Sequence, residues 1–148
     1  MAAAPDPQHV FFYGTLMRPF ATQARLGVEG WLQFVAPAQV RGALYDLGRY
    51  PGLVAGQRLV RGQLFRILDG RALAVLDRFE AYDPDDPAGS EYLRVLAALA
   101  DRPQTAWVYR FNRGVAGLPL IQCDDWAQYA AGRGGHDFEG FFRGRWQE

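Results

Sequence analysis

The sequence contains no lysine, one cysteine and two histidines among its 148 residues. The single cysteine, Cys123, cannot form an internal disulfide, and nothing around it resembles a thiolate metal site. His9 and His136 are far apart in the chain, so a zinc site or a Ser–His–Asp triad is poorly supported. These absences favour chemistry that uses neither a metal nor a serine or thiolate nucleophile.

The chain also has no excess of positive or negative charge, because 16 basic residues, all arginine, balance 16 acidic ones. A nucleic-acid-binding protein usually carries an excess of positive charge, so we expect no nucleic-acid partner. The longest purely apolar run, residues 95–100, is far shorter than a membrane span, and residues 1–8 lack the features of a signal peptide. We therefore expect a soluble cytoplasmic protein without a membrane partner, either a monomer or a weak dimer.

Hydrophobic periodicity predicts the main elements. Alternating or short apolar runs bounded by glycine and proline predict strands, and spacings of three and four residues predict helices. The expected strands are residues 9–13, 31–35 (closed by Pro37), 39–47, 58–67 (after a short apolar piece at 53–54), 92–98 and 105–111. The expected helices are a short one within 19–30, the strongest one at 71–79 after an Asp69 cap, and a last one at 126–131.

Strands and helices that do not alternate regularly predict an α+β fold. Hairpin-linked strands with glycine at their corners favour a small mixed β-barrel or a strongly curved sheet, with two or three flanking helices. We expect one domain over 9–131, a flexible leader at 1–8 and an irregular C-terminal tail at 132–148. Because a free tail would expose its aromatic residues, we expect the tail to pack on the body through Phe138, Phe141, Phe142 and Trp146.

The stretch from His9 to Leu16 combines a buried strand with an abrupt end at Gly14. Glycine permits backbone angles closed to other residues, and it lets a ligand approach the main chain closely. The N–H groups of Gly14, Thr15 and Leu16 then have no partner in the sheet, and such turns form concavities that bind anions. The alternative is an ordinary strand end, which short motifs of this kind often are.

Glu80 stands at the C-terminal end of the helix predicted at 71–79. The helix dipole disfavours negative charge there, and the aromatic neighbours Phe79 and Tyr82 favour partial burial. Both effects would raise the pKa of the carboxyl towards the range of a general base near neutral pH. The alternative is a surface carboxylate, which most glutamates are.

Several short motifs occur in an order that resembles the gamma-glutamylcyclotransferase-like family. They are Tyr13-Gly-Thr-Leu16, Gly48-Arg-Tyr-Pro-Gly-Leu53, Leu76-Asp-Arg-Phe-Glu80, Glu91-Tyr-Leu-Arg94, Trp107-Val-Tyr109, and Asp124-Asp-Trp126 with Tyr129. The resemblance covers about residues 9–130 and is strongest to the short bacterial and gamma-glutamylamine members.

The resemblance implies a compact mixed fold and a γ-glutamyl amide as small-molecule substrate, cyclised to 5-oxoproline with release of an amine or amino acid. It implies no cofactor and no metal. Tyr13, Gly14, Thr15 and Leu16 would hold the α-amino-acid end of the substrate, with Tyr13 shaping the pocket, and Glu80 would be the acid/base. Tyr92 is a candidate to flank the site, whereas Tyr109 fits the core better.

The sequence departs from the family at Ala81, where relatives often carry glycine. The acidic loop around Asp83, Asp85 and Asp86 would favour cationic leaving amines, although such loops are usually only solvated. A calcium site there is disfavoured by its prolines and ligand spacing. Two other functions stay open: a binding module without turnover, and removal of a γ-glutamyl protecting group during natural-product maturation, which would need a wide pocket mouth near 82–90.

Overall fold

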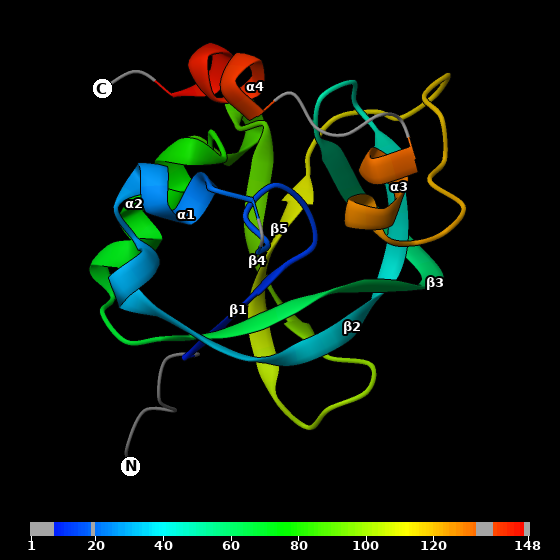
Figure 1. Ribbon diagram of the computed structural model, residues 1–148. Helices are drawn as coiled ribbons and strands as arrows, with labels where there is room; N and C mark the ends of the chain where they lie inside the picture. Colours follow the sequence, from blue (N-terminus) through cyan, green and yellow to red (C-terminus); the bar gives the residue numbers. More distant parts are fainter. Residues whose placement is uncertain (1–7, 19, 133–137, 147–148) are drawn as a thin grey trace.

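The computed structural model describes residues 8–18, 20–132 and 138–146, and Figure 1 shows their arrangement. The elements in chain order are β1 (His9–Phe12), α1 (Thr22–Leu26), the 3-10 turn η1 (Glu29–Trp31), β2 (Leu32–Asp46), β3 (Pro51–Ile67), α2 (Arg71–Phe79), the 3-10 turn η2 (Pro87–Gly89), β4 (Tyr92–Ala98), β5 (Thr105–Phe111), α3 (Trp126–Gly132) and α4 (Phe138–Arg145). None of the helices in the described ranges has the length and apolar character needed to cross a membrane.

The strands form one five-stranded mixed sheet in the order β2-β3-β1-β5-β4. β1 pairs antiparallel with β3 and parallel with β5, and β2 and β4 are the two edges. The predicted α+β class is confirmed. The barrel alternative is wrong, because the edge strands do not pair with each other and the sheet stays open.

The β2–β3 ribbon bends sharply where two glycines meet. Gly42 pairs with Arg58 but the next residue, Ala43, pairs with Val54, so β3 bulges by several residues there. A Cβ atom on Gly56 would lie 2.8 Å from the carbonyl carbon of Gly42, so this close approach requires glycine. Bulges increase local bending and twist, and the sheet therefore curves without having to close.

Residues 32–46 form one edge strand, where two strands were expected at 31–35 and 39–47. The strand β2 continues through Pro37, which was expected to end the first of them. Proline is tolerated at a sheet edge because its missing N–H is not needed by a second neighbour, and a register shift between Phe34 and Ala36 lies beside it. Likewise, the pieces at 53–54 and 58–67 belong to the single strand β3.

The core is one cluster of buried side chains from the strands, from α2 and from α3. Val10 and Phe11 of β1 are almost completely buried, as are Leu76 and Phe79 of α2. The helix has the bounds predicted from its apolar stripe, although Gly70 takes the N-cap position and Asp69 accepts the Arg71 N–H at 2.9 Å. In Figure 1 this arrangement brings the end of α2 to the side of the sheet where β1 ends.

The C-terminal segment is helical over residues 138–145, so the prediction of an irregular tail is wrong there. This helix, α4, raises the number of α-helices in the described ranges to four, against the two or three expected. Phe142 is 3% exposed and Trp146 packs against the core, as expected of a tail that docks on the body. The side chains of Phe138 and Phe141 lie outside the described residues, as does most of the predicted leader.

A buried ion pair ties α2 to the sheet, and its loss should destabilise the protein. Asp77 Oδ1 accepts from Arg94 Nε at 2.8 Å and from the Tyr109 hydroxyl at 2.7 Å, with the Asp77 and Arg94 side chains 12% and 18% exposed. Asp77→Ala leaves the Arg94 charge buried without its partner, so the free energy of unfolding should fall by about 3–5 kcal/mol. Urea denaturation measures this loss.

The matched control is Asp69→Ala, which breaks the pair with Arg71, a side chain that is 73% exposed. Solvent screens an exposed pair, so its loss should be far smaller. Equal losses in the two variants would contradict the assigned role of Asp77.

Candidate functional site

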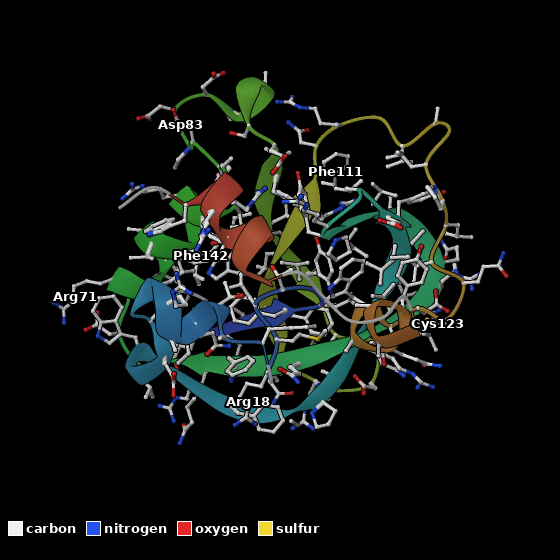
Figure 2. The ribbon with its side chains drawn as sticks, turned by 45° about the horizontal axis from the view of Figure 1, so that its top comes forward. Arg18, Arg71, Asp83, Phe111, Cys123 and Phe142 are labelled. Atoms are coloured by element: carbon white, nitrogen blue, oxygen red, sulfur yellow. The ribbon has the colours of Figure 1, made fainter. Side chains whose placement is uncertain are left out.

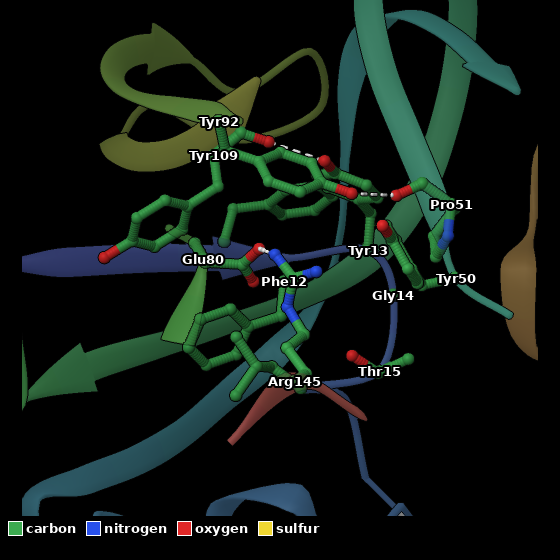
Figure 3. A pocket seen from close by; sticks show the side chains of 12 residues that line it. Phe12, Tyr13, Gly14, Thr15, Tyr50, Pro51, Glu80, Tyr92, Tyr109 and Arg145 are labelled. Carbon is green, nitrogen blue, oxygen red and sulfur yellow. Dashed lines mark hydrogen bonds and ion pairs between the residues drawn. The ribbon is translucent and has the colours of Figure 1, made fainter. Parts of the chain in front are cut away.

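A small pocket opens where β1 ends. Its cavity of about 30 Å³ has room for about one water molecule. Its lining residues come from the first strand and the following loop, the start of β3, the end of α2, the last two strands and α4: Phe11, Phe12, Tyr13, Gly14, Thr15, Leu16, Tyr50, Pro51, Glu80, Tyr92, Tyr109 and Arg145. Figure 3 shows these side chains converging from their different elements.

The loop after β1 is held by two buried side chains of α1. The Thr22 hydroxyl donates to the Thr15 carbonyl at 2.6 Å, and Gln23 Nε2 donates to the Leu16 carbonyl at 2.7 Å. In a planar trans peptide the N–H points opposite to the C=O, so the Leu16 N–H faces away from α1. Within the described part of the chain, the N–H groups of residues 14–16 donate to no protein acceptor. The loop therefore keeps backbone donors for a ligand, as an anion-binding turn does.

Close packing fixes this loop against the start of β3. A Cβ on Gly14 would lie 2.8 Å from Pro51 Cγ, so the contact needs glycine. The Pro51 carbonyl accepts the Tyr92 hydroxyl at 2.7 Å, and the Tyr109 carbonyl accepts the Tyr13 hydroxyl at 2.5 Å. Both phenol groups are thereby anchored to the backbone of residues that line the pocket.

Glu80 caps α2 and places its carboxyl in the pocket. Its N–H closes the last helical turn on the Leu76 carbonyl at 2.9 Å, and its side chain is 13% exposed. Burial raises the pKa of Glu80 to about 7; the Arg145 guanidinium, whose Nη2 lies 3.8 Å from Oε2, lowers it, and the Glu91 charge raises it. Figure 3 shows the carboxyl and the guanidinium pointing at each other. A carboxyl with this pKa can both take up and release a proton near neutral pH.

The tyrosines around Glu80 remain neutral. Burial raises the pKa of Tyr13 and of Tyr92 well above the ordinary value, and the nearby Glu80 charge raises both further. The pKa of Tyr109 is raised by burial and by Asp77, to which its hydroxyl donates. These phenols can therefore donate hydrogen bonds and shape the cavity, whereas Glu80 is the group suited to proton transfer.

The structure brings all six predicted site residues to one pocket: Tyr13, Gly14, Thr15, Leu16, Glu80 and Tyr92. Their roles stay predictions. Sequence reasoning missed Tyr50, Glu91 and Arg145. Tyr50 and Glu91 belong to motifs that were noted only for turn chemistry or family resemblance. Arg145 had no local signal, because nothing in its neighbourhood indicates which cavity it reaches.

The acidic loop takes no part in lining this pocket. Asp83 accepts the Asp85 N–H at 2.9 Å and Asp86 accepts the Gly89 N–H at 3.2 Å, so these carboxylates order their own loop. Figure 2 places Asp83 at the periphery of the molecule. Ala81 has φ 53°, a left-handed conformation that favours glycine.

Comparison with known proteins gives matches in sequence and in structure. The family described as gamma-glutamyl cyclotransferase, AIG2-like matches residues 10–128. The gamma-glutamylcyclotransferase family protein YtfP of Escherichia coli K12 is 35% identical over 124 residues, which cover 79% of this chain and 94% of that protein.

Two solved structures show the same fold. The solution NMR structure of YtfP from Escherichia coli has a TM-score of 0.62 at 33% identity, covering 82% of this chain and 97% of that one. The crystal structure of an AIG2-like protein from Mus musculus has a TM-score of 0.67 at 19% identity, covering 88% and 95%, and at this identity it bears on the fold alone.

The burial of Glu80 should make stability depend on pH. Below pH 4.5 the carboxyl is protonated whether the chain is folded or not; between 4.5 and about 7 only the unfolded chain ionises, so stability falls as pH rises. A rise in the pKa of Glu80 from 4.5 to about 7 corresponds to a loss of about 3 kcal/mol in the free energy of unfolding. Glu80→Gln removes the charge. Its free energy of unfolding should therefore exceed that of wild type by up to about 3 kcal/mol at pH 8 and equal it near pH 4.

Urea unfolding from pH 4 to pH 8 measures this difference. Glu29→Gln, at an exposed glutamate, is the control and should track wild type throughout. If the advantage of Glu80→Gln does not grow with pH, the carboxyl is not buried as described.

Proposed function

The chain belongs to the gamma-glutamyl cyclotransferase, AIG2-like family, and we propose that it cyclises a γ-glutamyl amide to 5-oxoproline with release of a free amine or amino acid. The observation that carries this proposal is the buried carboxyl of Glu80, with a pKa of about 7, in one pocket with the unpaired N–H groups of residues 14–16.

The substrate supplies its own nucleophile in this reaction. The ionised Glu80 carboxyl removes a proton from the substrate's α-ammonium, and the freed amine attacks the γ-carbonyl carbon, forming the ring C–N bond. The protonated carboxyl then returns the proton to the leaving nitrogen as the original amide C–N bond breaks. The ring nitrogen gives its second proton to the ionised carboxyl, which passes it to the released amine, so that the lactam is neutral and the amine leaves as an ammonium. No water is consumed, and Glu80 ends in its starting state. A group with a pKa near the working pH performs both transfers well.

The second contribution to catalysis in this proposal is the positioning of the substrate. An anion cradle at Gly14, Thr15 and Leu16 suits the α-carboxylate of the γ-glutamyl group, because three backbone N–H donors are available there. Holding this end keeps the amine close to the γ-carbonyl, and a well-oriented intramolecular attack can lower the barrier by about 7–11 kcal/mol. Tyr13 and Tyr92, anchored through their hydroxyls, would form the wall that keeps the substrate folded.

The natural-product alternative finds no support in the pocket's shape. A large acceptor would need an open mouth near residues 82–90, and none of these residues lines the pocket. A binding module without turnover would not need a carboxyl whose pKa lies near 7, whereas a proton carrier does. The presence of Glu80 therefore favours the enzyme.

Glu80→Gln should lower the rate of 5-oxoproline release by about 10²–10⁴-fold, because the amide cannot carry the proton. The assay measures 5-oxoproline released from γ-glutamyl amines, γ-glutamyl dipeptides and glutathione by wild type and variant. Substrate binding should change much less than kcat, because glutamine keeps the shape of the side chain.

Glu29→Gln provides the matched control, since it makes the same change at an exposed position. Turnover that survives Glu80→Gln unchanged would remove Glu80 as the proton carrier. If wild type releases 5-oxoproline from no member of the panel, the binding-module alternative gains instead.

A further inference from the structure

Arg145 reaches from α4 into a box of aromatic and acidic side chains beside Glu80. Its guanidinium carbon lies 4.7 Å from the ring centre of Tyr50, 5.5 Å from that of Phe79 and 5.6 Å from that of Tyr92. Nε donates to the Phe79 carbonyl at 2.8 Å and Nη2 donates to Glu91 Oε1. The Arg145 side chain is only 12% exposed. Aromatic faces with a carboxylate are the surroundings that recognise a desolvated cation.

The walls of this box are also held by contacts that do not involve α4. The Tyr50 hydroxyl donates to Glu91 Oε2 at 3.0 Å and so orients that carboxylate. Tyr92 is anchored to the Pro51 carbonyl, and Phe79 ends the well-packed helix α2. We call Tyr50, Phe79, Glu91 and Tyr92 the cation box. All four residues lie within the family match at 10–128, whereas α4 begins ten residues beyond it, at Phe138.

Aromatic contacts dock α4 over the pocket. Phe142 and Trp146 pack on Phe79, with ring centres 6.4 Å and 6.3 Å away. Arg25 of α1 stacks on Phe142 at 4.6 Å and Arg78 of α2 stacks on Trp146 at 4.3 Å. Figure 2 labels Phe142 on this helix. On the body, these contacts involve side chains of α1 and α2 and none from a strand of the sheet.

The docked helix leaves no space for a substrate. With Arg145 in place the cavity holds about 30 Å³, enough for about one water molecule. A γ-glutamyl amide is many times larger, so the pocket must widen before such a molecule can reach Glu80, and Arg145 is the lining residue that α4 contributes. Its departure opens the cation box directly beside the proposed acid/base.

We propose that the cation box is a subsite for a guanidinium or ammonium group on the amine half of the substrate, and that Arg145 fills it as an internal substitute while α4 is docked. In naming a substrate, this proposal rests on the proposed function. The leaving nitrogen must lie within hydrogen-bond reach of Glu80, and Arg145 Nη2 lies 3.8 Å from that carboxyl. A cation in the box is therefore only a few bonds from the leaving nitrogen, as in a γ-glutamyl diamine or aminoalkylguanidine.

The first experiment measures binding without turnover. Arg145→Ala should bind n-propylguanidinium, which has the shape of the missing side chain, and should gain thermal stability from it. Wild type should bind it far more weakly, because its own arginine competes for the box. Adding Glu91→Gln to Arg145→Ala should weaken binding by about tenfold or more, since the charge-assisted contact is lost.

Controls separate the charge of the probe from its shape. n-Propylurea, a neutral molecule of the same shape, should not bind to Arg145→Ala. Arg143→Ala, at an exposed arginine of the same helix, should behave as wild type. If Arg145→Ala does not fold alone, recovery of its unfolding transition with n-propylguanidinium but not with n-propylurea is the supporting result. Absence of binding, or equal binding of the neutral probe, would overturn the subsite.

The second experiment compares a γ-glutamyl aminoalkylguanidine with a neutral γ-glutamyl alkylamide of equal length. In Arg145→Ala the kcat/KM for the cationic substrate should exceed that for the neutral one by about tenfold or more, and Glu91→Gln should abolish this preference. If n-propylguanidinium binds as expected but neither substrate is turned over, the subsite stands and the proposed function fails. Turnover without any preference for the cationic substrate would overturn the subsite alone.

Discussion

The burial of one carboxyl group shapes the whole site. Glu80 follows the last turn of α2, where Leu76 and Phe79 are buried in the core, and its own side chain is 13% exposed. Burial favours the neutral acid, and the opposing charges of Arg145 and Glu91 adjust the balance, giving a pKa of about 7. The fold thus accepts a destabilising group, a common sign of a functional position.

The rest of the pocket supplies what that carboxyl needs. Within the described residues, the N–H groups of residues 14–16 donate to no protein acceptor, and Thr22 and Gln23 hold two carbonyls of the same loop. The phenols of Tyr13 and Tyr92 are tied to backbone carbonyls and stay neutral. The C-terminal helix then fills the remaining space with an arginine, so the chain contains both a site and the side chain that occupies it.

The local sequence pattern was enough to predict the bounds of several helices and strands. The helix at 71–79 and the strands at 92–98 and 105–111 have the predicted bounds, since each carries its own periodicity and is delimited by turn residues. The same reasoning failed at Pro37, because a single sequence does not reveal that the strand lies at a sheet edge, where proline is tolerated. It failed for the tail as well, where helix formation depends on the surface that α4 docks against.

The sequence by itself determined the family, the α+β class, the abrupt end of the first strand and the placing of Glu80 at a helix terminus, because each depends on neighbouring residues or on short motifs in order. Only the tertiary structure decided that the sheet stays open, that these residues meet in one pocket and that Arg145 enters it. Those outcomes depend on contacts between segments far apart in the chain, such as residue 145 with residues 80 and 91. Such distances leave no periodic trace in the sequence.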